Sequence, residues 1–243
     1  MKKFVSFVVL CGMYFVNTST LLAQEASGGG LSELHNVFKD KFVTGGVEWM
    51  SPILLVLIVG LAIVIERIIY LNFATTNTAK LLKKVEEALG SGGVAAAKEI
   101  CRNTKGPVAS IFYQGFERFE EGAEMIEKAI ISYGGVQMAK LEKGMVWIQL
   151  FIALSPSLGF LGTIIGMIKA FDDIAIAGDI SPSIVAGGMM IALLTTVFGL
   201  IVAMILQVFY NYLLNKINSL VNSMEDSSIS MMDIIVKHKN KAQ

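Results

Sequence analysis

Hydroxyl side chains inside strongly apolar segments are the residues of this sequence best suited to chemistry. Thr195 and Thr196 stand side by side in "ALLTTVFGLIVAM" (192–204), and Ser155 and Thr163 lie in "SPSLGFLGTIIGMIKAF" (155–171). Hydroxyl oxygens can coordinate a dehydrated cation or hold a chain of water molecules. They can equally donate to a backbone carbonyl one turn earlier or join two helices. The residues alone leave both roles open.

No carboxylate or basic side chain accompanies these hydroxyls. Residues 145–168 and 184–213 contain no Asp, Glu, Lys, Arg or His. Because proton paths through lipid use titratable side chains, the chain either moves no ion or needs a partner that brings a carboxylate. The absence of embedded acids, nucleophiles and ligand clusters argues against an enzyme, a cofactor or a resident metal. The one metal contact that the residues leave open is a transient, dehydrated hard cation such as Na⁺ near Thr163, Thr195 and Thr196.

The composition indicates an all-α integral membrane protein. Hydrophobic residues make up 54% of the 243 residues and charged residues 16%, with a mean hydropathy of +0.63, values typical of membrane proteins. The net charge of zero argues against a nucleic-acid partner. Cys11 and Cys101 have neither metal-ligand nor disulfide spacing, and His35 and His238 lie in polar segments.

Hydropathy divides the chain into membrane-spanning and polar segments. Residues 1–23 have the pattern of a signal peptide, with a retained N-terminal anchor as the alternative. Residues 24–49 combine a linker with an amphipathic helix, which either lies in the membrane interface or packs on another subunit. The further predicted segments are spans at 50–73, 145–170 and 184–213, a helical segment at 74–144, an acidic loop at 171–183 and a tail at 214–243.

Charge sets the predicted topology. Fourteen of the 20 Lys and Arg residues lie in 74–144 and in the tail, so the positive-inside rule places both in the cytoplasm. A cleaved signal peptide puts the new N-terminus outside, which agrees with three spans in an N-out, C-in orientation. Glu66 and Arg67 then mark the inner water boundary of the first span, as an ion pair from which Arg67 extends to water.

Small residues predict close packing between the second and third spans. Gly159, Thr163, Gly166 and Ala170 share one predicted face, as do Ala192, Thr196, Gly199 and Ala203, with Thr195 one step round. Small side chains let helix backbones approach closely in lipid. The residues that we expect to serve packing are Gly159, Gly162, Gly166, Ala192, Gly199 and Ala203.

These motifs resemble the MotA/TolQ/ExbB proton-channel family. The resemblance covers residues 47–218 and rests on Gly-x-x-Gly-Thr (159–163) and Ala-Leu-Leu-x-Thr-x-x-Gly-Leu (192–200), with Glu66–Arg67 fitting as well. Three spans and a signal peptide resemble the ExbB-like branch. The resemblance implies a bacterial inner-membrane ring, generally a pentamer, around a dimer of ExbD-type single-span proteins whose Asp carries the ion. It also implies that the motor drives a TonB-type transducer for outer-membrane import.

Two positions depart from the family pattern. Ile191 stands where ExbB- and TolQ-like members usually have a Glu, and Leu154 precedes Ser155–Pro156 where they tend to have a Thr. The first departure puts proton coupling in doubt, and the pair Thr195–Thr196 resembles that of sodium-driven stators. The alternatives are a TolQ-like motor subunit for envelope maintenance and a non-conducting membrane scaffold. The hydroxyls Ser155, Thr163, Thr195 and Thr196 are the predicted lining of an ion path.

Overall fold

The computed structural model describes residue 36 and residues 39–242, all of whose regular elements are helices. The chain separates into two compact units, residues 1–44 and residues 45–243. In the first unit, residues 39–44 are helical, and the Thr44 hydroxyl donates to the Asp40 carbonyl at 2.8 Å. The signal peptide and most of the predicted interfacial helix lie outside the described residues. The helix of the first unit ends before Gly45 and Gly46, where the sequence predicts a break.

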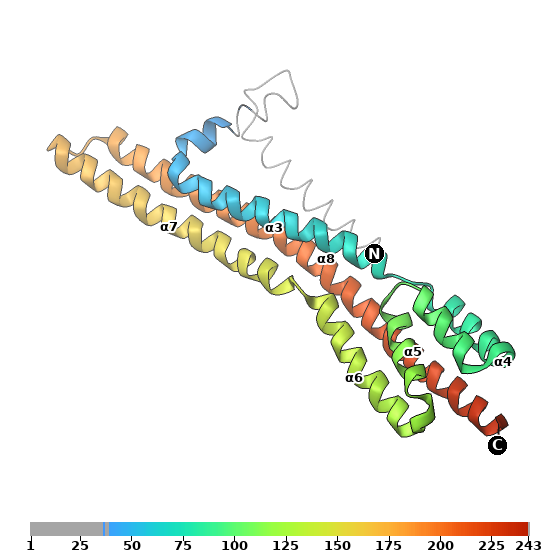
Figure 1. Cartoon of the computed structure of the whole chain (residues 1–243). Helices are drawn as coiled ribbons and strands as arrows, with labels where there is room; N and C mark the ends of the chain where they lie inside the picture. The colour runs from blue at the N-terminus through green and yellow to red at the C-terminus, as the bar shows by residue number, and fades with distance from the viewer. Residues whose placement is uncertain (1–35, 37–38, 243) are drawn as a thin grey trace. The chain divides into compact units, whose positions relative to one another are not determined.

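The second unit consists of long and short helices joined by tight connections (Figure 1). Their bounds are α3 Val47–Ala74, α4 Thr78–Asn103, α5 Pro107–Glu117, the 3₁₀ turn η1 Phe119–Glu121, α6 Ala123–Glu142, α7 Met145–Ala177 and α8 Pro182–Ala242. Three helices among the described residues are long and apolar enough to cross a membrane, namely those containing α3, α7 and α8. The protein is therefore an all-α, multi-pass membrane protein.

Helix α8 is the longest element and continues well past the predicted third span. Its 61 residues correspond to roughly 90 Å at 1.5 Å per residue, about three times the thickness of a bilayer's hydrocarbon core. The sequence predicts a change of segment near residue 213, but no helix end occurs there, because the apolar periodicity continues through Leu213, Ile217 and Leu220. One helix thus extends from the apolar α3–α7 region to the shorter helices α4 to α6.

Helices α4 to α6 pack around the second half of α8. Phe112 of α5, Ile126 of α6 and Met231 of α8 are fully buried there. Helix α4 is bent at Gly93, whose φ of +69° only glycine adopts readily. His238, which the sequence places in a polar segment, is half-buried and packs edge-on against Phe119 with ring centroids 6.4 Å apart.

Helices α7 and α8 form an antiparallel pair joined by residues 178–181, and α3 contacts both (Figure 1). Helix α7 continues to Ala177, seven residues past the predicted end of the second span. Gly178, at φ +70°, ends it, and its N–H donates to the Ile174 carbonyl at 3.0 Å. The Ser181 hydroxyl accepts from the N–H of Ile184 at 3.3 Å and caps the start of α8.

Candidate functional site

Glycines on both helices bring α7 and α8 into backbone contact along a line that we call the seam. A Cβ atom on Gly162 would lie 2.4 Å from the Thr195 hydroxyl oxygen, and one on Gly199 would lie 2.5 Å from the Ser155 carbonyl oxygen. Near the other end, a Cβ on Gly188 would lie 2.4 Å from that of Ala170. Real Cβ atoms essentially never approach so closely, so any larger side chain would force the helices apart.

At some positions, the residue that lies in the seam is the sequence neighbour of the one predicted to lie there. Its buried members on α7 are Ser155, Gly159, Gly162, Gly166 and Ala170, and on α8 they are Gly188, Ala192, Thr195 and Gly199. Thr163 and Thr196, predicted to lie on the packing faces, are only half-buried, while Thr195 is 0% exposed. Ala203 is also half-buried, and Val202 takes the buried position instead. Thr163, Thr196 and Ala203 therefore lie at the edge of the contact rather than at its centre.

Each of the four predicted hydroxyls donates to a backbone carbonyl. The Ser155 hydroxyl donates to Phe151 at 2.7 Å, and that of Thr163 donates to Phe160 at 2.6 Å. The Thr195 hydroxyl is shared between the carbonyls of Ile191 and Ala192, at 3.1 and 2.9 Å. A hydroxyl that donates in this way keeps lone pairs on its oxygen, so the bonds do not by themselves use up its capacity as a ligand.

Thr196 differs from the other three because its bond crosses the seam. Its hydroxyl lies 3.3 Å from the carbonyl oxygen of Gly159 on α7, and also 3.3 Å from that of Ala192 on its own helix. The close approach at Gly159, where a Cβ would lie 3.1 Å from the Thr196 Cα, makes this bond geometrically feasible. Thr196 therefore links the two helices and still has part of its surface open.

The adjacent hydroxyls Thr195 and Thr196 thus occupy different environments. One residue corresponds to about 100° of rotation on a helix, so Thr195 enters the seam while Thr196 lies at its edge. Ser155 and Thr195 are both 0% exposed within the single chain. Of the four predicted hydroxyls, only those of Thr163 and Thr196 can therefore contact another molecule directly.

The charged pair Glu66–Arg67 lies at the end of α3 nearest the soluble helices. The guanidinium donates from Nε to Glu66 Oε2 at 2.8 Å and from Nη2 to Oε1 at 3.0 Å. Arg67 does not extend to water as expected, because its side chain is only 9% exposed, whereas that of Glu66 is 57% exposed. The guanidinium also lies 5.1 Å from the centroid of the Tyr70 ring.

Arg67 turns inward because Gly144 makes room for it. Gly144 precedes α7 with φ +88°, and a Cβ there would lie 3.3 Å from Arg67 Nε. Arg67 Nη1 is buried without a hydrogen-bond partner in the described structure. The arginine thus fixes α3 against the start of α7, at the junction of the apolar and soluble helices. Sequence patterns gave no signal for this contact other than the isolated glycine before an apolar run.

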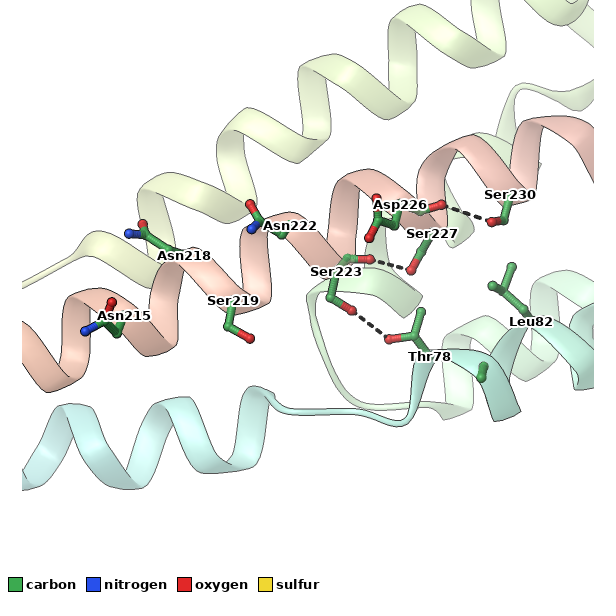
Figure 2. A pocket seen from close by; sticks show the side chains of 11 residues that line it. Thr78, Leu82, Asn215, Asn218, Ser219, Asn222, Ser223, Asp226, Ser227 and Ser230 are labelled. Atoms are coloured by element: carbon green, nitrogen blue, oxygen red, sulfur yellow. Dashed lines mark hydrogen bonds between the residues drawn. The ribbon is translucent and has the colours of Figure 1, made fainter. Parts of the chain in front are cut away.

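Polar contacts between α8 and the α3–α4 region were not predicted from the sequence. Lys216 Nζ donates to the side-chain oxygen of Asn72, and the hydroxyls of Thr78 and Ser223 lie 3.0 Å apart. Thr78 and Ser223 border an open groove of about 610 Å³ between α4 and α8, lined mostly by Asn and Ser side chains of α8 (Figure 2). The recurrence of Asn and Ser at helical spacing after residue 210 was the available signal.

Comparison with known proteins identifies a family match and several relatives of this chain. A family model described as the MotA/TolQ/ExbB proton channel family matches residues 103–226, which include α5 to α7 and most of α8. A biopolymer transport protein ExbB homolog of Methanothermobacter thermautotrophicus is 28% identical over 173 residues, 69% of this chain and 60% of that protein. This chain therefore spans less than two thirds of that relative.

Two further relatives carry similar names. The biopolymer transport protein ExbB-like 3 of Synechocystis sp. is 29% identical over 173 residues, 70% of this chain and 81% of the relative. The biopolymer transport protein ExbB of Helicobacter pylori is 32% identical over 76 residues, 31% of this chain and 52% of that protein. The matches to the first two relatives each extend over more than two thirds of this chain.

Proposed function

The chain belongs to the MotA/TolQ/ExbB proton channel family, and from this premise we propose that it is the ring-forming subunit of an ExbB-like, ion-driven motor in the bacterial inner membrane. The proposed orientation is N-out and C-in, with α4 to α6 and the end of α8 in the cytoplasm. The proposed ring, generally a pentamer in this family, surrounds a dimer of ExbD-type single-span proteins. A TonB-type transducer receives the work for outer-membrane import.

One observation carries the proposal: a hydroxyl-bearing seam joins two apolar helix segments, 145–168 and 184–213, that contain no Asp, Glu, Lys, Arg or His. Because neither segment has such a group, a partner must supply the carboxylate that binds the moving ion. Each ion crossing a membrane potential of 100 mV releases about 2.3 kcal/mol, so a few ions provide useful work. The partner's intramembrane Asp is the proposed carrier.

Among the predicted lining residues, we assign the ion path to Thr163 and Thr196, which are only half-buried in the single chain. Ser155 and Thr195 are closed inside the seam, so their proposed role is to hold α7 against α8. The ion is a proton or Na⁺, and Na⁺ is supported by the neutral oxygen ligands and by Ile191, which replaces the usual Glu.

The test removes hydroxyls without changing side-chain size. Thr163→Val and Thr196→Val should each abolish ion-coupled activity while native mass spectrometry still finds the same ring and its companion. Ser157→Ala is the matched control, because Ser157 is exposed on α7 and its hydroxyl donates to the Ala153 carbonyl at 3.0 Å. Activity at the control level in both threonine variants would refute the assignment. Repeating the assay in Na⁺-free medium separates Na⁺ from protons.

A second candidate is a non-conducting membrane scaffold. It is favoured by the back-bonding of all four hydroxyls, which is what purely structural threonines and serines do in apolar helices. The two candidates differ in their companion. Gentle extraction from native membranes should yield a ring with a small single-span protein if the chain is a motor subunit, and a homo-oligomer alone if it is a scaffold. A TolQ-like role in envelope maintenance predicts the same ring with a different companion.

A further inference from the structure

One face of α8 has no partner in the described chain over nearly the whole length of the helix. In its first half this face is apolar and repeats every three or four residues. The exposed side chains there are Leu193 (62%), Val197 (48%), Leu200 (47%), Met204 (50%) and Val208 (37%). No residue of the described part of the chain covers this strip, so we infer that it meets either lipid or another molecule.

The same face changes character below the apolar strip. At the same helical spacing it continues as Asn211, Asn215, Asn218 and Asn222, of which the last three are exposed. Asn211 accepts a bond from the Gln207 side chain at 3.3 Å, whereas no side-chain bond joins the other three to the described chain. Asn215, Asn218 and Asn222 also line the open groove that Thr78 borders (Figure 2). These amides form a row of unused donors and acceptors.

Beyond the amides the face becomes acidic. Glu225, Asp226 and Asp233 are exposed and take part in no ion pair of the described chain. Lys216 is the last basic residue of α8 before Lys237, and its ammonium is turned toward Asn72 on α3. Beside the acids runs a largely apolar groove of about 630 Å³ between α8 and α6, with Ile229 and Ile131 each 66% exposed.

We propose that the amide and acidic zones, Asn215 to Asp233, bind the cytoplasmic flank of the single-span partner, and that this flank is a Lys- or Arg-bearing segment directly preceding its membrane helix. The inference rests on the proposed function, which places this end of α8 in the cytoplasm. Basic residues accumulate on the cytoplasmic side of membrane helices. A partner helix lying along the apolar strip would therefore bring cations next to Glu225, Asp226 and Asp233.

Other occupants fit the charge pattern less well. A second copy docking through the same face would bring these carboxylates against one another, which is unfavourable. Anionic lipid headgroups are repelled by the same carboxylates. A cationic peptide is attracted to the acids, and the free amides above them can bond to its backbone or side chains. The groove beside Ile229 offers space for apolar side chains of the same segment.

The first experiment locates the partner by photocrosslinking in native membranes. A photoreactive amino acid at Asn218 or Asn222 should crosslink to a single-span protein through a peptide that carries Lys or Arg and precedes its apolar segment. The same residue at Glu87, exposed on α4, should not. The proposal is overturned if Asn218 and Asn222 crosslink only to a second copy, only to lipid or to nothing.

The second experiment reverses the charges. Glu225→Lys with Asp226→Lys should lower the amount of companion retained on the ring by roughly tenfold, because it removes two favourable charge pairs and adds repulsion against the basic flank. The neutral pair Glu225→Gln with Asp226→Asn should have a smaller effect in the same direction. Glu86→Lys with Glu87→Lys, an exposed acidic pair on α4, is the matched control and should leave retention unchanged.

The outcomes distinguish this inference from the proposed function. If the wild-type ring retains its companion and the Glu225 and Asp226 reversal retains just as much, the docking of the flank is overturned and the motor assignment stands. A wild-type ring without any companion overturns both. Equal loss in the α4 control would attribute the effect to net charge rather than to this face, and would also overturn the inference.

Discussion

Replacing Gly188 with alanine should loosen the packing of α7 against α8, whereas the same change at the adjacent Gly187 should not. A Cβ on Gly188 would lie 2.4 Å from the Ala170 Cβ, 2.7 Å from the Gly166 carbonyl oxygen and 3.1 Å from the Ala170 Cα. Two of these three atoms belong to backbone, which cannot turn aside as a flexible side chain would. A Cβ on Gly187 would meet nothing within 4 Å.

The magnitude follows from two opposing terms. Overpacking a close contact costs about 1–3 kcal/mol, and the gain in helix propensity from glycine to alanine is up to ~1 kcal/mol. Gly187→Ala meets no clash and gains only the propensity term, so it should stabilise the protein slightly. The propensity term is common to both positions and cancels when the two variants are compared. Gly188→Ala should then be less stable than Gly187→Ala by about 1–3 kcal/mol.

Thermal unfolding of both variants in the same detergent measures this difference. Adding Ala170→Gly to Gly188→Ala removes the nearest clash but not the contact with the Gly166 carbonyl, so it should restore part of the loss. The double-mutant cycle then gives the coupling between the two positions. Equal unfolding temperatures for the Gly187 and Gly188 variants would refute the backbone contact between α7 and α8.

Two further predictions concern the rest of the unit. Gly144→Ala should destabilise the protein by about 1–2 kcal/mol in the same unfolding assay, because alanine is strained at φ +88° and its Cβ would lie 3.3 Å from Arg67 Nε; Gly135→Ala, with open space around it, is the control and should show no loss. Burial raises the pKa of the Cys101 thiol from 9.0 to about 12, so native Cys101 should resist alkylation at pH 8. The folded thiol holds its proton more tightly than the unfolded one, so its contribution to stability is complete below pH 9 and is lost as the pH rises from 9 to about 12. Thermal unfolding across this range should show a decline that Cys101→Ala reduces.

Much of the helical plan follows from the sequence because apolar runs and glycine breaks are strong local signals. The apolar cores of α3, α7 and α8 and the interruption near Gly93 are evident from composition alone. The continuity of α8 is not, because a fall in hydropathy near residue 213 resembles the end of a segment. Contacts of the later apolar residues with α4, α5 and α6 stabilise the helix beyond that point.

The candidate site was harder to predict because packing in lipid depends on pairs of helices. Small residues identify a close contact, but adjacent small or hydroxyl residues such as Gly162–Thr163 and Thr195–Thr196 are equally good candidates for its centre. The contact atoms decide the matter, since Gly162 lies against Thr195. Arg67 was misplaced for a similar reason: its position in the sequence indicates a boundary, and only Gly144 of another helix determines that it turns inward.

The pairing of Thr195 with Thr196 now has a physical explanation that does not require both to face an ion. Thr195 fills the space that Gly162 leaves, and its hydroxyl is satisfied by carbonyls of its own helix. Thr196 bonds across to Gly159 and keeps part of its surface open. Thr195 is therefore buried inside the seam, and Thr196 lies at its edge. Because Thr196 is attached to both helices, an ion or partner group bound there would act on the α7–α8 contact itself, and ion passage could thereby be coupled to movement between the helices.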